Sequence, residues 1–277
     1  MENIQKLYKA LQSADTIVVG AGAGLSTAAG FTYSGERFER HFADFIRQYG
    51  FTDMYTAGFY NFPTQEEFWA YWSRHIYFNR YVPAPKPVYD NLLKLLKGKN
   101  YFVITTNVDH QFQKAGCDKQ RLFYTQGDYG LFQCAKPCHK KTYDNEEVIK
   151  KMIAQQEDMR IPTELIPKCP VCGGKMVPNL RSDETFVQDE GWHAASQRYT
   201  DFLTRHKDGR VLFLDLGSGG NTPIIFKIPF IKITMQNPNA TYATVNLGEA
   251  FTVNQIADRS IVIDADIAVV LEEMINL

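Results

Sequence analysis

Short apolar runs alternate with segments of helical periodicity along this chain. The apolar runs predict strands at residues 16–20, 101–106, 121–126, 211–217, 242–247 and 260–264. Amphipathic patterns predict a leading helix at residues 3–13 and a closing helix at residues 266–276. Strands separated by helical segments form βαβ units, so we expect an α/β fold with a Rossmann-like parallel sheet.

Two stretches interrupt this alternation. Residues 31–88 carry aromatic side chains at helical spacing, which predicts packed helices, and they end in a proline-rich stop at residues 83–87. Residues 131–182 contain four cysteines around a charged helical segment. We therefore expect three parts: a Rossmann-like core at 1–30, 89–130 and 183–277, an inserted helical module at 31–88 and a small module at 131–182.

Composition narrows the class of protein. The 277 residues are enough to bury a sizeable core. The 30 lysines and arginines nearly balance the 31 aspartates and glutamates, which argues against binding of nucleic acid or of an anionic membrane. The N-terminal residues lack the apolar segment of a signal peptide, and no run approaches the roughly 20 apolar residues of a membrane-spanning helix. We therefore expect a cytoplasmic protein.

Four of the five cysteines occur in two pairs with the spacing of metal-binding turns. Such turns place two thiolates on one tetrahedral Zn²⁺, and four thiolates leave no open position for water. The pairs therefore predict a structural zinc site that makes residues 131–182 a small zinc-binding module, with the ligands Cys134, Cys138, Cys169 and Cys172. His139 is a competing ligand, and Cys117 is expected to be a small buried residue outside the site.

The first predicted strand runs into a glycine-rich turn that opens a helix. Glycines at such a turn let backbone N–H groups and the helix dipole approach a diphosphate, which a Cβ would obstruct. The G-x-G-x-x-G spacing of dinucleotide-binding turns is not met, because Leu25 and Thr27 stand where the third glycine would be. From this spacing alone, a phosphate cradle and an ordinary tight turn both remain open.

Polar residues also follow the ends of later strands. Asn107 and Asp109 come after the strand at 101–106, and Gln126 comes at the end of the next strand. Three further positions follow in the last third of the chain: the turn at 217–221, Asn246 and Asp266. Each one alone is also compatible with a strand-end turn and a helix N-cap.

Together these motifs resemble the sirtuin family over nearly the whole chain. The sirtuin turn Gly-Ala-Gly-x-Ser-x-x-x-Gly is matched throughout residues 22–30, and the strand ends and the paired cysteines follow in the family's order. The resemblance implies a Rossmann-like NAD-binding core with NAD as the substrate. The contacts to NAD that it implies are Gly22, Ala23, Gly24, Ser26, Phe31, Tyr33, Gly217, Ser218, Asn221, Asn246 and Asp266.

The resemblance also implies roles in catalysis. Asp109 would hold the carboxamide of NAD, and Asn107 would place a polar group at the ribose as nicotinamide leaves. Most sirtuins have a histidine acting as general base at the position of Gln126, and glutamine cannot titrate, although it can orient a hydroxyl group. The family's peptide-clamping motif is absent at residues 178–183, where Arg181 can hold an acceptor or a phosphate.

Without a titrating base, the chemistry that remains is transfer of ADP-ribose to an acceptor. A carboxylate acceptor is already ionised and needs no base. The combination of Gln126 with a remodelled clamp resembles the class M sirtuins of bacteria. That resemblance implies a protein ADP-ribosyltransferase whose acceptor is a lipoylated carrier protein like the glycine-cleavage H protein, with a macrodomain protein as a further partner.

Three alternatives remain open at this point. A deacylase would need a general base at a position other than that of Gln126, and His110 is the candidate. Because His110 comes at the start of a helix, we expect its side chain to point away from Asn107. An NAD glycohydrolase would use water as the acceptor. A module that binds NAD or ADP-ribose without turnover is disfavoured because Asn107 and Asp109 are both kept.

Overall fold

All six predicted strands form, and they make one parallel sheet. The computed structural model describes residues 2–220 and 222–277. Each neighbouring pair of strands in the sheet runs parallel. The predicted α/β class with a parallel sheet is therefore confirmed. The strand order is β3 (Leu122–Tyr124), β2 (Tyr101–Thr105), β1 (Thr16–Ala21), β7 (Val211–Leu216), β8 (Thr241–Val245) and β9 (Ser260–Ile263).

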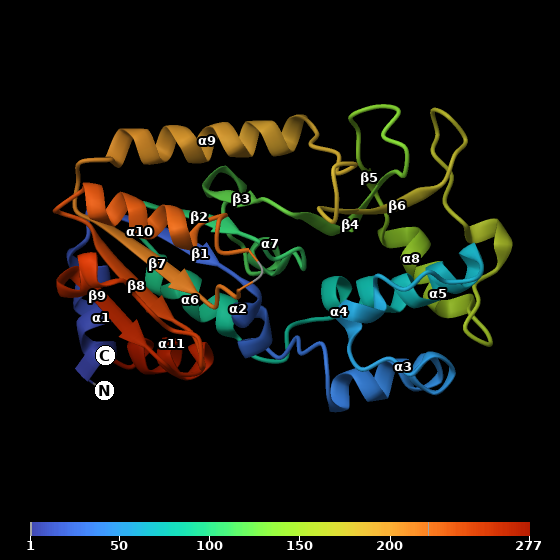
Figure 1. The fold of residues 1–277 in the computed structure, drawn as a ribbon, viewed down its shortest axis with the longest axis horizontal. Helices are drawn as coiled ribbons and strands as arrows, with labels where there is room; N and C mark the ends of the chain where they lie inside the picture. The colour runs from blue at the N-terminus through green and yellow to red at the C-terminus, as the bar shows by residue number, and fades with distance from the viewer. Residues whose placement is uncertain (1, 221) are drawn as a thin grey trace.

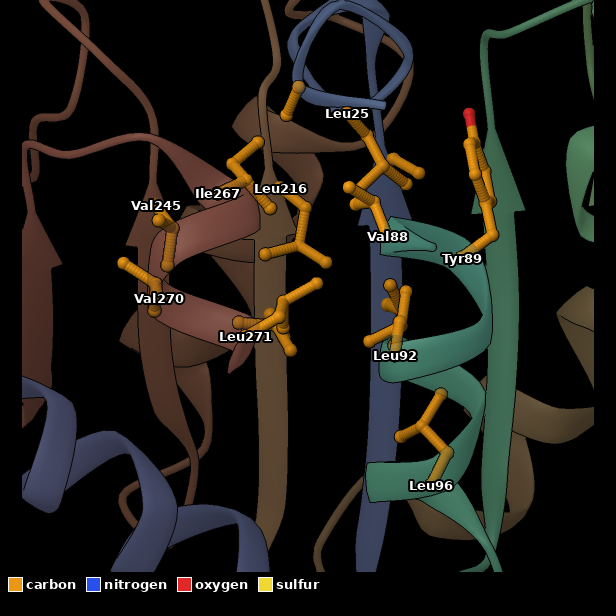
Figure 2. Close-up of a cluster of buried hydrophobic side chains, with 14 of the residues drawn as sticks. Leu25, Val88, Tyr89, Leu92, Leu96, Leu216, Val245, Ile267, Val270 and Leu271 are labelled. Carbon is orange, nitrogen blue, oxygen red and sulfur yellow. The ribbon is translucent and has the colours of Figure 1, made fainter. Parts of the chain in front are cut away.

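Helices cover both faces of this sheet, which explains why its strands are continuous apolar runs rather than alternating ones. Every residue of β1 and β7 is buried. Figure 2 shows Leu92 and Leu96 of one helix and Val270 and Leu271 of another lying against the sheet. One face carries α1 (Glu2–Ser13), α2 (Ala23–Ala28), α6 (Val88–Leu96) and α11 (Ile267–Ile275), and the other carries α9 (Glu190–His206) and α10 (Lys227–Gln236).

The rest of the chain forms a second half beside the sheet (Figure 1). Its antiparallel sheet has the order β5 (Tyr143–Asp144), β4 (Gly127–Cys134) and β6 (Met176–Leu180). Its helices are α3 (Glu36–Tyr49), α4 (Met54–Ala57), α5 (Gln65–Ile76), the π-helical turn η1 (Tyr77–Tyr81) and α8 (Glu146–Gln155). The short elements that remain in the chain as a whole, some of them beside the main sheet, are α7 (Gln111–Lys114), η2 (Lys119–Arg121), η3 (Thr163–Leu165) and η4 (Asn254–Arg259).

The two predicted insertions share one hydrophobic core. Phe42, Phe45 and Trp69 of the aromatic segment are fully buried, as their helical spacing predicts. The Trp69 ring lies 4.8 Å from the ring of Phe132 on β4, which belongs to the cysteine-containing segment. The helical module and the cysteine module therefore pack as one unit, although the sequence pattern presents them as separate.

Among the described residues, no helix is both long and apolar enough to cross a membrane.

The topology determines where a ligand can bind. The strand order reverses between β1 and β7, and open α/β sheets bind ligands at the carboxyl end of such a switch point. The turn that begins at Gly22 follows β1, and the turn that begins at Gly217 follows β7. At the same edge, β4 leads from the sheet into the second half of the molecule (Figure 1). The candidate site should therefore lie where the two halves meet.

Candidate active site

The two glycine turns at the switch point touch each other through their backbones. Gly24 N donates a hydrogen bond to Gly217 O at 2.9 Å. A Cβ on Gly24 would lie 2.7 Å from Gly217 Cα, and one on Gly22 would lie 2.5 Å from Gly217 O. Gly217 also has a φ of +71°, which favours glycine. The close approach of the turns therefore requires these glycines, and the N–H of Gly24 is already paired within the protein.

Two of the predicted contacts with NAD, Ser218 and Asn246, join this pair of turns. Asn246 Nδ2 donates to Ser218 O at 3.0 Å, and Asn246 is 8% exposed. The Ser218 hydroxyl points inward and donates to Asp215 Oδ2 at 2.6 Å. Burial raises the pKa of Asp215, whose carboxylate also accepts from the Tyr242 hydroxyl. The structure thus brings Ser218 and Asn246 together with Gly24, above a buried carboxyl group.

A compact hydrogen-bonded cluster lies beyond the ends of β1 and β2. Asn107 Nδ2 donates to Gly22 O at 2.9 Å, and it also lies 3.4 Å from Tyr89 Oη. Ser26 Oγ donates to Asp109 Oδ2 at 2.5 Å and lies 2.9 Å from Tyr89 Oη. Three predicted site residues are therefore linked through Tyr89. Sequence reasoning missed this tyrosine because α6 presents it as one more member of a buried apolar face.

The carboxyl group of Asp109 is enclosed by the protein. Asp109 is 5% exposed, and burial raises its pKa. Its Oδ2 accepts from Ser26, and its Oδ1 accepts from the backbone N–H of Gln111 at 3.2 Å. The carboxyl group thus holds the loop after β2 in place through hydrogen bonds. The predicted contact between Asp109 and the carboxamide of NAD stays a prediction.

Gln126 and Arg181 lie side by side, although they are far apart in sequence. The pairing of β4 with β6 brings them together, and Arg181 N donates to Gln126 O at 2.9 Å. The Arg181 guanidinium lies 4.8 Å from the ring centre of Phe186 and 5.6 Å from that of Trp192. Throughout the described part of the chain, no carboxylate pairs with Arg181. Its charge is therefore available to an anionic ligand.

The His110 side chain is fixed by a hydrogen bond, so its ring cannot rotate freely. It adopts a left-handed φ of 64°, and its Nδ1 is hydrogen-bonded to the Asp128 carboxylate. The second oxygen of Asp128 accepts from Arg80 Nε at 2.9 Å. Burial alone would raise the pKa of Asp128, but the hydrogen bond from His110 and the charge of Arg80 hold it below its usual value. Sequence reasoning missed Asp128 and Arg80, which stand far apart in the chain.

The aromatic residues of the loop after Gly30 are packed inside the protein. Phe31 is 2% exposed in the core under the main sheet. The Tyr33 hydroxyl is 2.7 Å from the Tyr129 hydroxyl, which is 2.8 Å from Nε2 of His75. Burial lowers the pKa of His75 to about 3, so this ring is neutral. The predicted contacts of Phe31 and Tyr33 with NAD stay predictions, and in this conformation Phe31 offers almost no surface.

Two further contacts with NAD are predicted, Asp266 and Asn221, and Asp266 follows β9. Asp266 caps α11, because its side chain accepts from the backbone N–H of Ala268 at 2.8 Å. That observation fits the structural interpretation of Asp266 and leaves its contact with NAD a prediction. Asn221 lies outside the described residues.

The four paired cysteines converge as the spacing predicts. Their sulfur atoms all lie within 4.8 Å of one another, and the Cys134–Cys172 and Cys138–Cys169 pairs are both 3.7 Å apart. A tetrahedron with Zn–S bonds of about 2.3 Å has edges of about 3.8 Å, so the thiols fit zinc. Cys117 lies outside the cluster, and burial raises its pKa to about 11. It is therefore a poor nucleophile.

Comparison with known proteins agrees with this architecture. The model of the Sir2 family matches residues 22–190. A protein ADP-ribosyltransferase of Staphylococcus aureus is 42% identical over 266 residues, which cover 96% of this chain and 84% of that protein. A probable bifunctional ADP-ribose hydrolase/ADP-ribosyltransferase of Fusarium oxysporum f. sp. cubense is 32% identical over 243 residues, covering 82% of this chain and 39% of that protein. A solved Sir2 complex with a p53 peptide and NAD⁺ shares the fold, with a TM-score of 0.62, 23% identity and coverage of 99% and 97% of the two chains.

Proposed function

Because the chain belongs to the Sir2 family, which uses NAD as the substrate of its chemistry, we propose that it is an NAD-dependent protein ADP-ribosyltransferase. The observation that carries this proposal is the 42% identity to a protein of that name over 96% of the chain. The site supports it, because a side chain that cannot titrate, Gln126, lies beside an unpaired arginine, Arg181. That arrangement suits an anionic acceptor better than it suits base catalysis.

The reaction breaks the bond between C1′ of the ribose and nicotinamide, and an acceptor oxygen then bonds to C1′. Positive charge develops on the ribose as nicotinamide leaves, and a preorganised polar group stabilises that charge. Asn107 supplies such a group, because its amide nitrogen is fixed on Gly22 O. Arg181 would hold an acceptor carboxylate near the ribose, and Gln126 would orient the substrate through hydrogen bonds.

A deacylase would need one further step that this site is not built to perform. In that reaction a base removes a proton from a ribose hydroxyl so that the oxygen can attack the acyl intermediate. Gln126 cannot take the proton, and the Nδ1 atom of the candidate substitute, His110, is already engaged by Asp128. Transfer to a carboxylate avoids the step altogether, since the acceptor is ionised before it binds.

The acceptor we propose is a lipoylated carrier protein of the glycine-cleavage H type. The support is the resemblance to class M sirtuins, which combine a glutamine at this position with a remodelled clamp. A hydrolase that removes ADP-ribose, such as a macrodomain protein, is the proposed partner. Its support is the relative from Fusarium oxysporum f. sp. cubense, whose name joins an ADP-ribose hydrolase to an ADP-ribosyltransferase.

Labelled NAD distinguishes the possible activities by their products. The protein is incubated with NAD labelled in the adenylate, together with a lipoylated carrier, the same carrier without lipoate, or an acetyl-lysine peptide. We expect label on the lipoylated carrier, little on the unmodified carrier and no deacetylated peptide. Free ADP-ribose in every reaction would indicate a glycohydrolase, and no consumption of NAD would indicate a binding module.

Asn107→Ala supplies the matched control for these reactions. It removes the amide that we place at the ribose and should lower transfer about a hundredfold or more, as the loss of one preorganised polar group does in other enzymes. Because Asn107 is only partly buried, the variant should remain folded. Transfer that survives Asn107→Ala would show that the label arrives by another route.

A further inference from the structure

One buried hydroxyl group contacts three polar side chains of the hydrogen-bonded cluster beyond the ends of β1 and β2. Tyr89 Oη lies 2.9 Å from Ser26 Oγ, 3.4 Å from Asn107 Nδ2 and 3.5 Å from Asp109 Oδ2. Tyr89 itself is 2% exposed, so a bound substrate cannot reach it. Figure 2 shows its ring standing on α6 beside the sheet, with the hydroxyl directed toward the ends of the strands. Tyr89 therefore acts on the reaction only through its neighbours.

The contacts fix which way the Asn107 amide faces. Gly22 O is a carbonyl oxygen and can only accept, so the amide atom 2.9 Å from it must be the nitrogen. The second N–H of that nitrogen is the one that faces Tyr89 Oη. Both amide hydrogens of Asn107 are thus used inside the protein. Among residues 2–220 and 222–277, no group donates to Asn107 Oδ1, so the oxygen is the atom left for the substrate.

The shorter contacts in this cluster favour one arrangement of the hydrogen atoms. Ser26 has a single hydroxyl hydrogen, and it is donated to Asp109. In the 2.9 Å contact between Ser26 and Tyr89, the tyrosine is therefore the donor, and the Asp109 Oδ2 atom at 3.5 Å is the weaker acceptor within reach of the same hydroxyl. Tyr89 in turn accepts from Asn107. The result is a chain of donors from Asn107 through Tyr89 and Ser26 to the Asp109 carboxyl group, and each bond polarises the next.

We propose that Tyr89 is a positioning residue that turns the Asn107 carbonyl oxygen toward the reacting ribose and couples it to Asp109. An amide oxygen carries partial negative charge, so in this orientation it stabilises the positive charge that develops at C1′. Without the Tyr89 hydroxyl, one N–H of Asn107 loses its partner and the amide can rotate away from this orientation. The inference rests on the proposed function only in that both require cleavage of NAD.

Tyr89→Phe tests the proposal because it removes the hydroxyl and keeps the buried ring. We expect kcat for nicotinamide release to fall about tenfold, the rate equivalent of one hydrogen bond, while KM for NAD changes less than about twofold. Tyr71→Phe is the matched control, since its buried hydroxyl donates to Met54 O in the second half, outside the catalytic cluster. That variant should leave both constants unchanged.

Ser26→Ala breaks the same chain one bond further along and extends the test. If the chain acts as a unit, kcat of the double variant Tyr89→Phe/Ser26→Ala should be no lower than that of the more damaged single variant. Multiplying losses would indicate independent structural effects and overturn the proposal. So would an unchanged kcat in a folded Tyr89→Phe protein, or equal losses in Tyr89→Phe and Tyr71→Phe.

Nicotinamide release keeps this test separate from the proposed function. Transfer, hydrolysis and deacylation all begin with cleavage of the same bond in NAD. A wild-type protein that deacetylates peptides would overturn the proposed function, yet the effect of Tyr89→Phe on nicotinamide release would still decide the inference. Normal transfer by the wild type with no effect of Tyr89→Phe would overturn the inference alone.

Discussion

The chemistry of this site depends on a few side chains whose orientation is fixed by neighbours. Asn107 is held by Gly22 O, and Asp109 is held by Ser26 and a backbone N–H. By resemblance to sirtuins, Gln126 stands at the position of the general base, and its backbone oxygen accepts a hydrogen bond from Arg181 N. We therefore expect that a substitution of Gln126 alone will not convert one reaction into the other, because the arrangement around it stays the same.

Gln126→His makes this expectation testable. The variant gains a titratable side chain, but Arg181 still occupies the adjoining strand end, with its guanidinium on two aromatic rings. We expect no deacetylation of an acetyl-lysine peptide, because nothing at residues 178–183 clamps the peptide. Mass spectrometry of the peptide after incubation with NAD measures this directly. Gln126→Ala, which should only weaken transfer, is the control, and efficient deacetylation by Gln126→His would contradict the argument.

The buried carboxylate of Asp128 leads to a prediction about how the stability of the fold depends on pH. Its pKa is lowered in the folded protein, so it stabilises the fold above the unfolded pKa of about 3.9, and this contribution is lost as pH falls through the folded value. Asp128→Asn should cost about 3 kcal/mol at pH 7, because it leaves Arg80 buried beside a neutral group. Urea unfolding from pH 7 to pH 3 should show the difference from wild type shrinking below about pH 4.

The control for Asp128 is a surface pair. Asp15→Asn removes the partner of Arg210 at the molecular surface and should change stability little at any of these pH values. A difference between wild type and Asp128→Asn that grows as pH falls would have the wrong sign and would contradict the assignment.

At the scale of elements, the site is built by two turns packed backbone to backbone. One follows β1, the other follows β7, and the sheet brings these strands side by side. The glycines therefore serve the contact between the turns as well as any bound diphosphate. A pattern of glycines in the sequence cannot separate these two reasons, because both demand the absence of a Cβ.

Gly24→Ala should damage both the fold and NAD binding. The new Cβ would lie 2.7 Å from Gly217 Cα and 3.1 Å from Asn246 Oδ1, so the turns must separate. We expect a loss of about 2 kcal/mol in the free energy of unfolding, typical of overpacking, and weaker NAD binding by calorimetry. Gly209→Ala is the control, because its nearest neighbour would be 3.5 Å away. Unchanged NAD affinity in Gly24→Ala would remove the turn from the binding site.

At the scale of the whole molecule, each half has its own hydrophobic packing. The first core lines both faces of the parallel sheet, and the second joins the aromatic helices to the cysteine cluster. Cys134 and Cys169 are themselves buried in that second core, next to Ile149 and Met152. A metal at the cysteines would therefore stabilise the helical segment as well as the small module around them.

Removal of zinc should consequently loosen the second half and spare the sheet. The purified protein should contain about one Zn²⁺ per chain, as expected for a single four-thiolate site. Chelation should change the environment of Trp69 and Trp72, which lie in the second core, more than that of Trp192 beside the main sheet. Tryptophan fluorescence of single-tryptophan variants measures this.

The Cys172→Ser variant should lose the metal, and the Cys117→Ser variant should keep it. A metal-free protein that melts like the native one would contradict the assignment.

The sequence by itself determined the features that depend on local order. Buried parallel strands must be apolar on both faces, so residues such as 16–20 and 211–217 could be recognised as strands without a structure. Cysteines a few residues apart are typical of turns that bind one metal ion, so the four cysteines that converge could be named from their spacing. Asn107, Asp109 and Gln126 could be singled out because they directly follow strands, where ligands bind.

Only the tertiary structure decided which distant groups touch. The Tyr89 hydroxyl, the pairing of Arg181 with Gln126 and the buried link from His110 to Asp128 all join elements that the chain separates. It also showed that the aromatic and cysteine segments share one core. Hydrophobic periodicity reports which face of an element is buried, but not what that face meets, because burial against any apolar partner lowers the free energy in the same way. Hydrogen bonds are directional and therefore distinguish one partner from another, and they form only when the fold places both atoms within reach.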